Sequence, residues 1–349
     1  MVLPGAARAS EPPYGRVLER YFLAGRFDGI ALVGHGDRIA YRGAAGLADR
    51  ARRRPHAIGE SFRIASITKQ FTALLAMQEV ERGRLELDAP LDRSLPGLPA
   101  AVAPVTLRQL LKNTSGLPNL DSIPDAYTRS DAPMDDLPAY VRTLPLAPLV
   151  APPGTKFSYN NLDYIVAGAL VQAVTGKSFA TLLGKRVIAP LGLHATGVYG
   201  AGIPDGHVKG YEEDHARLVD ETIGRLTNFG PAGAMYSTLG DLFRWDRALH
   251  RNALLGAAAT AEMFRADAAF GYVGLGSWSY DLTLPNAAKL HVVERQGNIG
   301  GIQVLNVFAP EADLTLIVLA NTDFAALFDL YSRRGLPYEL LSLAAMESR

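Results

Sequence analysis

The sequence lacks three things that would each point to a particular kind of protein. It has no cysteine, which excludes disulfide bonds, thiolate metal sites and a cysteine nucleophile. It has no apolar run of membrane-spanning length. Its 35 basic and 35 acidic side chains cancel, so no excess charge favours nucleic acid or an anionic membrane surface. What is left is the composition of an ordinary globular protein, long enough for two cores.

Several catalytic motifs are also missing. There is no Gly-x-Ser-x-Gly elbow, no Walker loop, no complete Gly-x-Gly-x-x-Gly and no His-Glu-x-x-His. The first three absences argue against an α/β-hydrolase, a P-loop enzyme and a standard dinucleotide binder. One polar cluster could be drawn as a metal site, but its spacing matches no known motif and we expect a solvated loop. It consists of His207, Glu212, Glu213, Asp214 and His215.

A Ser-x-x-Lys pair, Ser66 and Lys69, occurs once in the chain. The apolar spacing that follows Ser66 predicts a buried helix ending near Gly83. Lys69 then lies over the same face, where its amine can reach the Ser66 hydroxyl and act as a base. Such a base needs a pKa lowered by roughly three units, and burial and the helix N-terminus both act in that direction. Alternatively, Ser66 caps the helix and Lys69 is a solvated surface charge.

A second candidate stretch opens a later helix. Tyr159 is the only one of 14 tyrosines with an asparagine, Asn161, two residues on. A phenol can shuttle a proton between nucleophile and leaving group, and an amide can orient a substrate. The alternative is that Asn161 caps the helix and Tyr159 only packs.

A third candidate stretch, Arg295-Gln296-Gly297-Asn298, ends a predicted strand and leads into two further glycines. Glycines along a strand edge allow a substrate to approach the backbone closely. Arg295 could bind a carboxylate through two hydrogen bonds. The alternative is an exposed arginine at a turn.

The order of predicted elements indicates an α/β (α+β) fold. Hairpins of strands at both ends of the chain, with helices between them, imply one antiparallel sheet flanked by helices and an inserted, mainly helical domain. We predict a leader over residues 1–13, a sheet domain over 14–83 and 236–349, and the insertion over 84–235. The expected strands are 29–32, 38–41, 271–280, 290–294, 302–308 and 314–319, and the longer helices are 14–24, 162–174, 178–187 and 239–250.

Taken together and in order, these three stretches resemble the motifs of the serine β-lactamase and penicillin-binding-protein superfamily. The branch is similar to class C β-lactamases, low-molecular-weight DD-peptidases, D-aminopeptidases and β-lactamase-like esterases. The resemblance runs from about residue 29 to residue 321. Other stretches share it: Leu110 to Pro118, Pro153 to Tyr159, Pro190 to Leu193, and Ser237-Thr238 with Asp241.

The resemblance implies a β-lactamase/transpeptidase-like fold and an acyl-enzyme mechanism. Ser66 would attack a carbonyl, and Lys69 and Tyr159 would share the acid and base roles. Asn161 would contact the substrate amide, and the oxyanion would lie between the backbone N–H groups of Ser66 and Asn298.

Two departures from the family pattern stand out. Asn113 replaces a histidine, which we expect to affect packing only. Arg295-Gln296-Gly297 replaces the usual Lys/His-Thr/Ser-Gly, which keeps a positive charge but loses a small hydroxyl. This weakens the case for an efficient β-lactamase and leaves the substrate open.

The leading hypothesis is therefore a serine hydrolase that cleaves a small ester or amide, with a D-amino-acid peptide as one option. A DD-peptidase or weak β-lactamase is the near alternative. A penicillin-binding sensor that acylates without turnover is an alternative of another class, and a homologue with a dead site is a third. We expect a small-molecule or short-peptide substrate, no metal and no organic cofactor. The resemblance suggests a periplasmic or secreted protein, although the first residues contain no intact signal peptide. The sequence does not give the oligomeric state.

Overall fold

The structure of the protein is a computed structural model that describes residues 13–119, 134–200, 207–214, 217–220, 226–325 and 327–347. The predicted leader, residues 1–13, lies outside this description except for Pro13, where the first helix begins.

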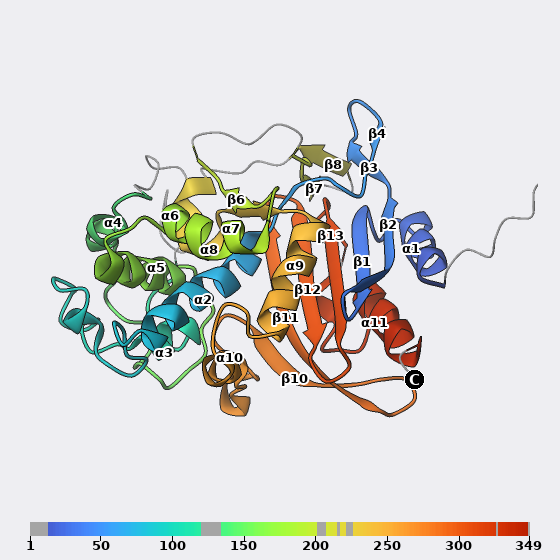
Figure 1. Ribbon diagram of the computed structural model, residues 1–349. Coiled ribbons are helices and arrows are strands. Elements are labelled where there is room, and N and C mark those ends of the chain that lie inside the picture. Colours follow the sequence, from blue (N-terminus) through green and yellow to red (C-terminus); the bar gives the residue numbers. More distant parts are fainter. Residues whose placement is uncertain are drawn as a thin grey trace, which may run out of the picture.

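A six-stranded antiparallel sheet brings the two ends of the chain together (Figure 1). The first strand pairs with the last along its whole length, from Gly29 opposite Ala320 to His35 opposite Leu314. This confirms the predicted sheet shared by both ends of the chain. In spatial order the strands are β10 (Trp278–Thr283), β11 (Lys289–Ile299), β12 (Ile302–Ala309), β13 (Leu314–Ala320), β1 (Gly29–His35) and β2 (Arg38–Ala45).

Both faces of the sheet are covered, and alternate residues of β1 supply the two cores. Ile30 and Leu32 belong to the core shared with α2 and α9, whereas Ala31 and Val33 belong to the core shared with α1 and α11. This is the two-residue alternation of a strand that is buried on both sides. The covering helices are α1 (Pro13–Leu23), α2 (Thr68–Glu81), α9 (Leu239–His250) and α11 (Gly335–Glu347).

The middle of the chain is mainly helical and lies beside the sheet, as Figure 1 shows. The long apolar helix α5 is central to it and ends at Gly176, which takes the left-handed conformation expected of a C-terminal cap. Short strands β6 (Gly197–Val198), β7 (Tyr211–Asp214) and β8 (Arg217–Asp220) add small sheets. The helices are α3 (Leu107–Leu111), α4 (Leu137–Thr143), α5 (Leu162–Thr175), α6 (Phe179–Leu183), α7 (Ala189–Leu191) and α8 (Gly230–Gly233). The predicted domain boundaries at residues 83 and 235 stay a prediction.

Two predicted elements differ in the structure. The strand predicted over residues 271–280 begins only at Trp278. Gly271, Tyr272 and Gly276 have positive φ angles of 71°, 64° and 89°, which interrupt an extended strand before that residue. The helix predicted from Ser178 starts at Phe179 with Ser178 as its cap. After Leu183 it continues as a π-helical turn over Gly184–Ile188.

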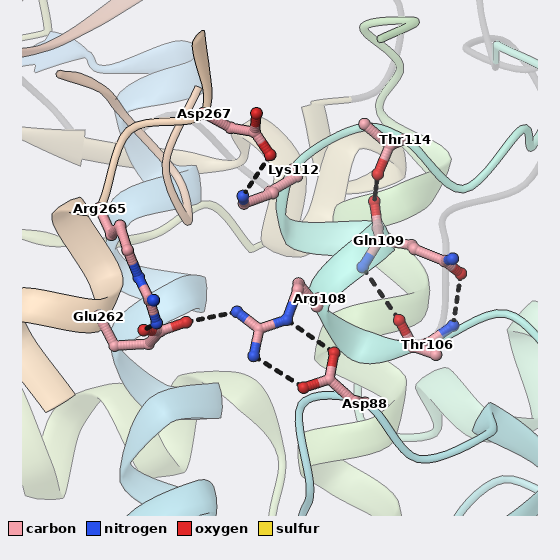
Figure 2. Close-up of polar contacts among 9 residues, drawn as sticks. All are labelled: Asp88, Thr106, Arg108, Gln109, Lys112, Thr114, Glu262, Arg265 and Asp267. Atoms are coloured by element: carbon pink, nitrogen blue, oxygen red, sulfur yellow. Dashed lines mark hydrogen bonds and ion pairs between the residues drawn. The ribbon is translucent and has the colours of Figure 1, made fainter. Parts of the chain in front are cut away.

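Charged side chains link the helical region to α10 (Ala257–Phe264), which precedes β10 in the chain (Figure 2). Arg108 of α3 donates two hydrogen bonds to Asp88, at 2.7 and 2.8 Å, and also donates to Glu262 of α10. Lys112 pairs with Asp267 at 2.9 Å. Asp88 is exposed, so its pair with Arg108 is screened by solvent, whereas the pairs Arg108–Glu262 and Lys112–Asp267 are partly buried and help hold the helical region against α10 and the segment after it.

Within the described part of the chain no single helix is long and apolar enough to cross a membrane. The helices α5 and α6–α7 pass such a test only as a pair, with a bend of 76° between them.

Candidate active site

The candidate nucleophile sits in a single tight turn that leads into α2. Ser66 lies in a 3-10 turn over Ala65–Ile67, and α2 begins at Thr68. Neither helix start uses the Ser66 hydroxyl as a cap, so the alternative reading of Ser66 as a capping residue is wrong. Ala65 has a φ of 44°, an unfavourable value for a residue with a side chain. Such strain is held only where the surrounding structure imposes it, often at functional sites.

Lys69 is completely buried and lies one helical turn from the nucleophile. Its ammonium donates to Ser66 Oγ at 2.9 Å, to Asn161 Oδ1 at 2.8 Å and to the Ala232 carbonyl at 2.8 Å. The alternative reading of Lys69 as a solvated surface charge is therefore wrong. The arrangement places the Lys69 amine where it could exchange a proton with the Ser66 hydroxyl.

Tyr159 reaches Ser66 from the other side. Its hydroxyl lies 2.6 Å from Ser66 Oγ, and Arg295 Nη2 donates to it at 2.9 Å. Burial by itself would raise the pKa of Tyr159, but the adjacent Lys69 and Arg295 cations outweigh it and lower the pKa to about 8. A phenol with this pKa is partly ionised near neutral pH, so it could accept or donate a proton.

Asn161 points its side chain into the site. It precedes α5 but makes no side-chain cap hydrogen bond; its oxygen accepts from Lys69. The capping role belongs to its neighbour Asn160, whose Oδ1 accepts from the backbone N–H of Asp163 at 2.8 Å. Asn161 therefore occupies the N-cap position of α5, but its side chain does not make the capping hydrogen bond that the alternative reading required.

Arg295 is buried and faces inward from β11. Its Nε donates to the Ser66 carbonyl at 2.9 Å, in addition to its bond to Tyr159. Its guanidinium also lies 4.8 Å from the ring centre of Trp278. The alternative of an exposed arginine at a turn does not fit this position, and two of its donors already serve the nucleophile and the phenol.

The last three predicted residues line the cavity beside Ser66. The cavity has a volume of about 550 Å³, and Gln296, Gly297 and Asn298 border it together with Ser66, Tyr159 and Arg295. The strand β10 begins at Trp278, opposite Glu294, so it does not pair with the part of β11 beyond that residue. A substrate could lie along this exposed strand edge. The structure thus brings all eight predicted residues to one place.

Comparisons with known proteins agree with this geometry. The Beta-lactamase family model matches residues 16–334. The chain belongs to the beta-lactamase family. Esterase EstB from Burkholderia gladioli is 31% identical over 342 residues, which cover 84% of this chain and 86% of that protein.

Two solved structures carry the same fold. A penicillin-binding protein from Bacillus halodurans has a TM-score of 0.74 and 26% identity, covering 90% of this chain and 98% of the other. A D-stereospecific amidohydrolase from Streptomyces sp. has a TM-score of 0.77 and 26% identity, covering 92% and 96%. The expected β-lactamase/transpeptidase-like fold is confirmed, and the protein is a serine hydrolase of the beta-lactamase family.

Asn113, where the family resemblance leads us to expect histidine, does more than fill space. Its φ of 52° is one that asparagine tolerates better than most residues. Its buried amide donates to the Asn160 carbonyl at 3.0 Å and to Asp163 Oδ2 at 2.9 Å. The expectation that this departure affects packing only is therefore wrong, because Asn113 braces the turn that carries Tyr159 and Asn161.

The polar cluster considered as a metal site is dispersed. His207 contacts the hydroxyls of Tyr199 and Ser61 at 2.9 and 3.4 Å, whereas Glu212 borders the catalytic cavity. His215 lies outside the described residues. Among the residues that are described, no group of three or more His, Asp or Glu side chains is placed to hold a metal ion.

Sequence reasoning missed several cavity residues. Trp278, Phe229 and Phe328 give the cavity apolar walls. They come from β10, from the turn before α8 and from the segment before α11, and no motif links them. Trp278 is the one that carried a signal, since it is one of only two tryptophans in the chain.

Replacing Gly297 with alanine is expected to lower kcat/KM by about 100-fold, because small displacements of reacting groups cost about this much. A Cβ at this position would lie 2.9 Å from the Ser66 backbone nitrogen and 2.8 Å from the Ile64 carbonyl oxygen. The backbone of the nucleophile would have to shift. Hydrolysis kinetics and the melting temperature should be measured for this variant and for Gly240→Ala, whose Cβ would meet nothing within 4 Å. Equal activity of Gly297→Ala and the parent protein would contradict a close approach of β11 to Ser66.

Proposed function

We propose that this protein hydrolyses small esters or amides, D-amino-acid amides or peptides among them, through an acyl-enzyme on Ser66. One observation carries the proposal: Ser66 Oγ lies 2.9 Å from the Lys69 amine and 2.6 Å from the Tyr159 hydroxyl. A serine hydroxyl is a weak nucleophile until a neighbouring base takes its proton. Here two candidate bases contact it at once.

The proposed reaction has two halves. Ser66 Oγ attacks the substrate carbonyl carbon, and its proton passes to the Lys69–Tyr159 pair. The backbone N–H groups of Ser66 and Asn298 stabilise the oxyanion. When the bond to the leaving group breaks, the pair returns the proton to the departing oxygen or nitrogen. In the second half, a water molecule attacks the carbonyl carbon of the ester on Ser66 and gives a proton to the same pair. The bond to Ser66 Oγ breaks, the pair returns the proton to Ser66 Oγ, and the acid product leaves.

The relatives support both ester and amide substrates. Esterase EstB and the D-stereospecific amidohydrolase are similar to this chain over most of their length. In the third motif of this chain, Arg295 donates to Ser66 and Tyr159, and Gln296 donates to Glu294 at 3.2 Å. Because the hydrogen bonds of Arg295 and Gln296 go to other protein groups, neither side chain is arranged mainly to bind a substrate carboxylate. This favours simple esters and amides over β-lactams as substrates.

A penicillin sensor that acylates without turnover is the second candidate. The changed third motif favours it, and so does the similarity to a penicillin-binding protein. A sensor would use the same nucleophile, Ser66, and the same proton carriers, Lys69 and Tyr159. It would lack only the second half of the reaction, in which water releases the acyl group.

The first measurement is the intact mass of the protein after brief exposure to a fluorescent penicillin or, separately, to a fluorophosphonate. The second is the rate at which the protein hydrolyses short nitrophenyl esters and D-amino-acid amides. We expect a fluorophosphonate adduct and ester or amide turnover, both absent in Ser66→Ala. A long-lived penicillin adduct without turnover of any ester or amide would establish the sensor instead. No adduct with either reagent, or activity that survives Ser66→Ala, would overturn the proposal.

A further inference from the structure

The catalytic cavity contains one carboxylate that the proposed reaction does not use. Of the described residues that line the cavity, Glu212 is the one acidic residue and Arg295 the one basic residue. The guanidinium of Arg295 is already engaged, because it donates to the Ser66 carbonyl and to the Tyr159 hydroxyl. The charge that is left for a substrate is therefore that of Glu212, and it is negative.

The main chain on both sides of Glu212 is held in place, which fixes the direction of its side chain. The Tyr211 N–H donates to the Asn321 carbonyl at 2.9 Å, and the Glu213 N–H donates to the two carboxylate oxygens of Asp323 at 3.1 and 3.0 Å. Successive side chains of a strand point to opposite sides. In β7 this directs Glu212 toward the cavity and the exposed Glu213 away from it.

The Glu212 carboxylate has no protein partner in the part of the chain that the structure describes. It makes no hydrogen bond and no ion pair there, although the side chain is half-buried. The cavity that it faces also has apolar walls, which include Phe229, Ile299 and Phe328. A charge that has lost part of its water in such a place gains more from a ligand cation than a fully solvated charge does.

Glu212 is close to the part of β11 that would hold the substrate carbonyl. The main chain of Tyr211 packs directly on Gly301, where an added Cβ would lie 2.4 Å from the Tyr211 nitrogen. Gly301 is three residues beyond Asn298, whose N–H is proposed to bind the oxyanion, and three residues of extended strand span at most about 10 Å. A group on a short aliphatic chain can therefore reach Glu212 while the carbonyl lies beside Ser66.

We propose that Glu212 binds an ammonium group of the substrate while Ser66 attacks the carbonyl. The substrate class is then an ester or amide that carries a protonated amine. An ammonium donates charge-assisted hydrogen bonds to a carboxylate, and these are stronger than hydrogen bonds between neutral groups. This inference rests on the proposed function, because it assigns part of the substrate to the same site.

Two pairs of substrates test the inference, and each pair exchanges the ammonium for a methyl group. The p-nitroanilides of 4-aminobutanoic acid and pentanoic acid differ in the acyl part, whereas the acetates of 4-aminobutanol and pentan-1-ol differ in the leaving group. Both amines are protonated at neutral pH. We expect the cationic member of at least one pair to have a kcat/KM about tenfold higher, the order expected of a hydrogen bond to a charged group. The pair that shows this preference identifies the part of the substrate that Glu212 holds.

Three variants assign the preference to one side chain. Glu212→Gln should remove it, because the amide keeps the shape and loses the charge. Glu212→Asp keeps the charge on a shorter stem and should retain part of it. Glu213→Gln is the matched control, since it makes the same change one residue along β7, on the side away from the cavity, and it should keep the full preference. Melting temperatures check that each variant is folded.

Equal kcat/KM values within both pairs, or a preference that Glu212→Gln leaves unchanged, would overturn the inference, while the hydrolysis observed would still support the proposed function. An equal loss of preference in Glu212→Gln and Glu213→Gln would also overturn it, because the effect would then come from the general charge of β7. If the parent protein hydrolyses none of these compounds and no nitrophenyl ester, the proposed function fails and the inference falls with it.

Discussion

Replacing Lys69 with methionine is expected to lower kcat/KM by about 10⁴-fold or more, and Ser66→Ala should lower it by a similar factor. Both values follow from the behaviour of catalytic groups that act as a unit, in which the loss of one member costs about as much as the loss of all. In this site the Lys69 amine contacts Ser66 Oγ directly. The double variant should therefore be no less active than either single variant.

The measurement is steady-state hydrolysis of one ester by the parent protein and the three variants, with thermal unfolding as the check on folding. Lys69→Met leaves the Asn161 oxygen and the Ala232 carbonyl without their donor. A loss of about 1–3 kcal/mol in stability would be usual for such buried acceptors, partly offset by removal of a buried charge. Multiplicative losses in the double variant would show that Lys69 acts independently of Ser66.

Tyr159→Phe is expected to lower kcat/KM by about 10²- to 10⁴-fold, the usual contribution of a general acid or base. It should also remove a pH dependence. In the parent protein the pKa of Tyr159 is lowered to about 8 because Lys69 and Arg295 outweigh the effect of burial. If the phenolate is the proton acceptor, activity rises with pH up to about 8 and then levels. An amide substrate is preferable, since esters hydrolyse on their own at high pH.

Arg295 provides the control for this assignment. Arg295→Gln removes one of the two cations that lower the pKa of Tyr159, so the rise in activity should move to higher pH. Arg295→Lys keeps the charge and should move it less. A profile that is flat between about pH 6 and 9, or one that does not respond to Arg295→Gln, would contradict a role for the Tyr159 phenolate.

The predictions that concern Ser66 and Tyr159 address different steps of one proposed reaction. In the proposed reaction, Lys69 and Ser66 form the acyl-enzyme and Tyr159 returns the proton to the leaving group. Arg295 connects them, since it contacts the Ser66 carbonyl, the Tyr159 hydroxyl and the ring of Trp278. Arg295 stands where the family resemblance leads us to expect lysine or histidine, and these three contacts offset the cost of burying its permanent charge.

The sequence by itself determined the elements whose signals are local. The helix predicted over residues 162–174 is α5 (Leu162–Thr175), the helix predicted over 239–250 is α9, and the apolar runs predicted over 302–308 and 314–319 are the strands β12 and β13. The order of Ser66-x-x-Lys69, Tyr159-x-Asn161 and Arg295-x-Gly297 was enough to identify the family, because each motif keeps its spacing within one short segment.

Only the tertiary structure decided what these side chains contact. The sequence could not show that Arg295 turns inward to Ser66 and Tyr159, because its partners lie 229 and 136 residues away along the chain. The same holds for the aromatic walls of the catalytic cavity, Trp278, Phe229 and Phe328, which come from β10, the turn before α8 and the segment before α11. Local propensity fixes helices and strands, whereas the meeting of distant residues depends on how the sheet and the helical region pack.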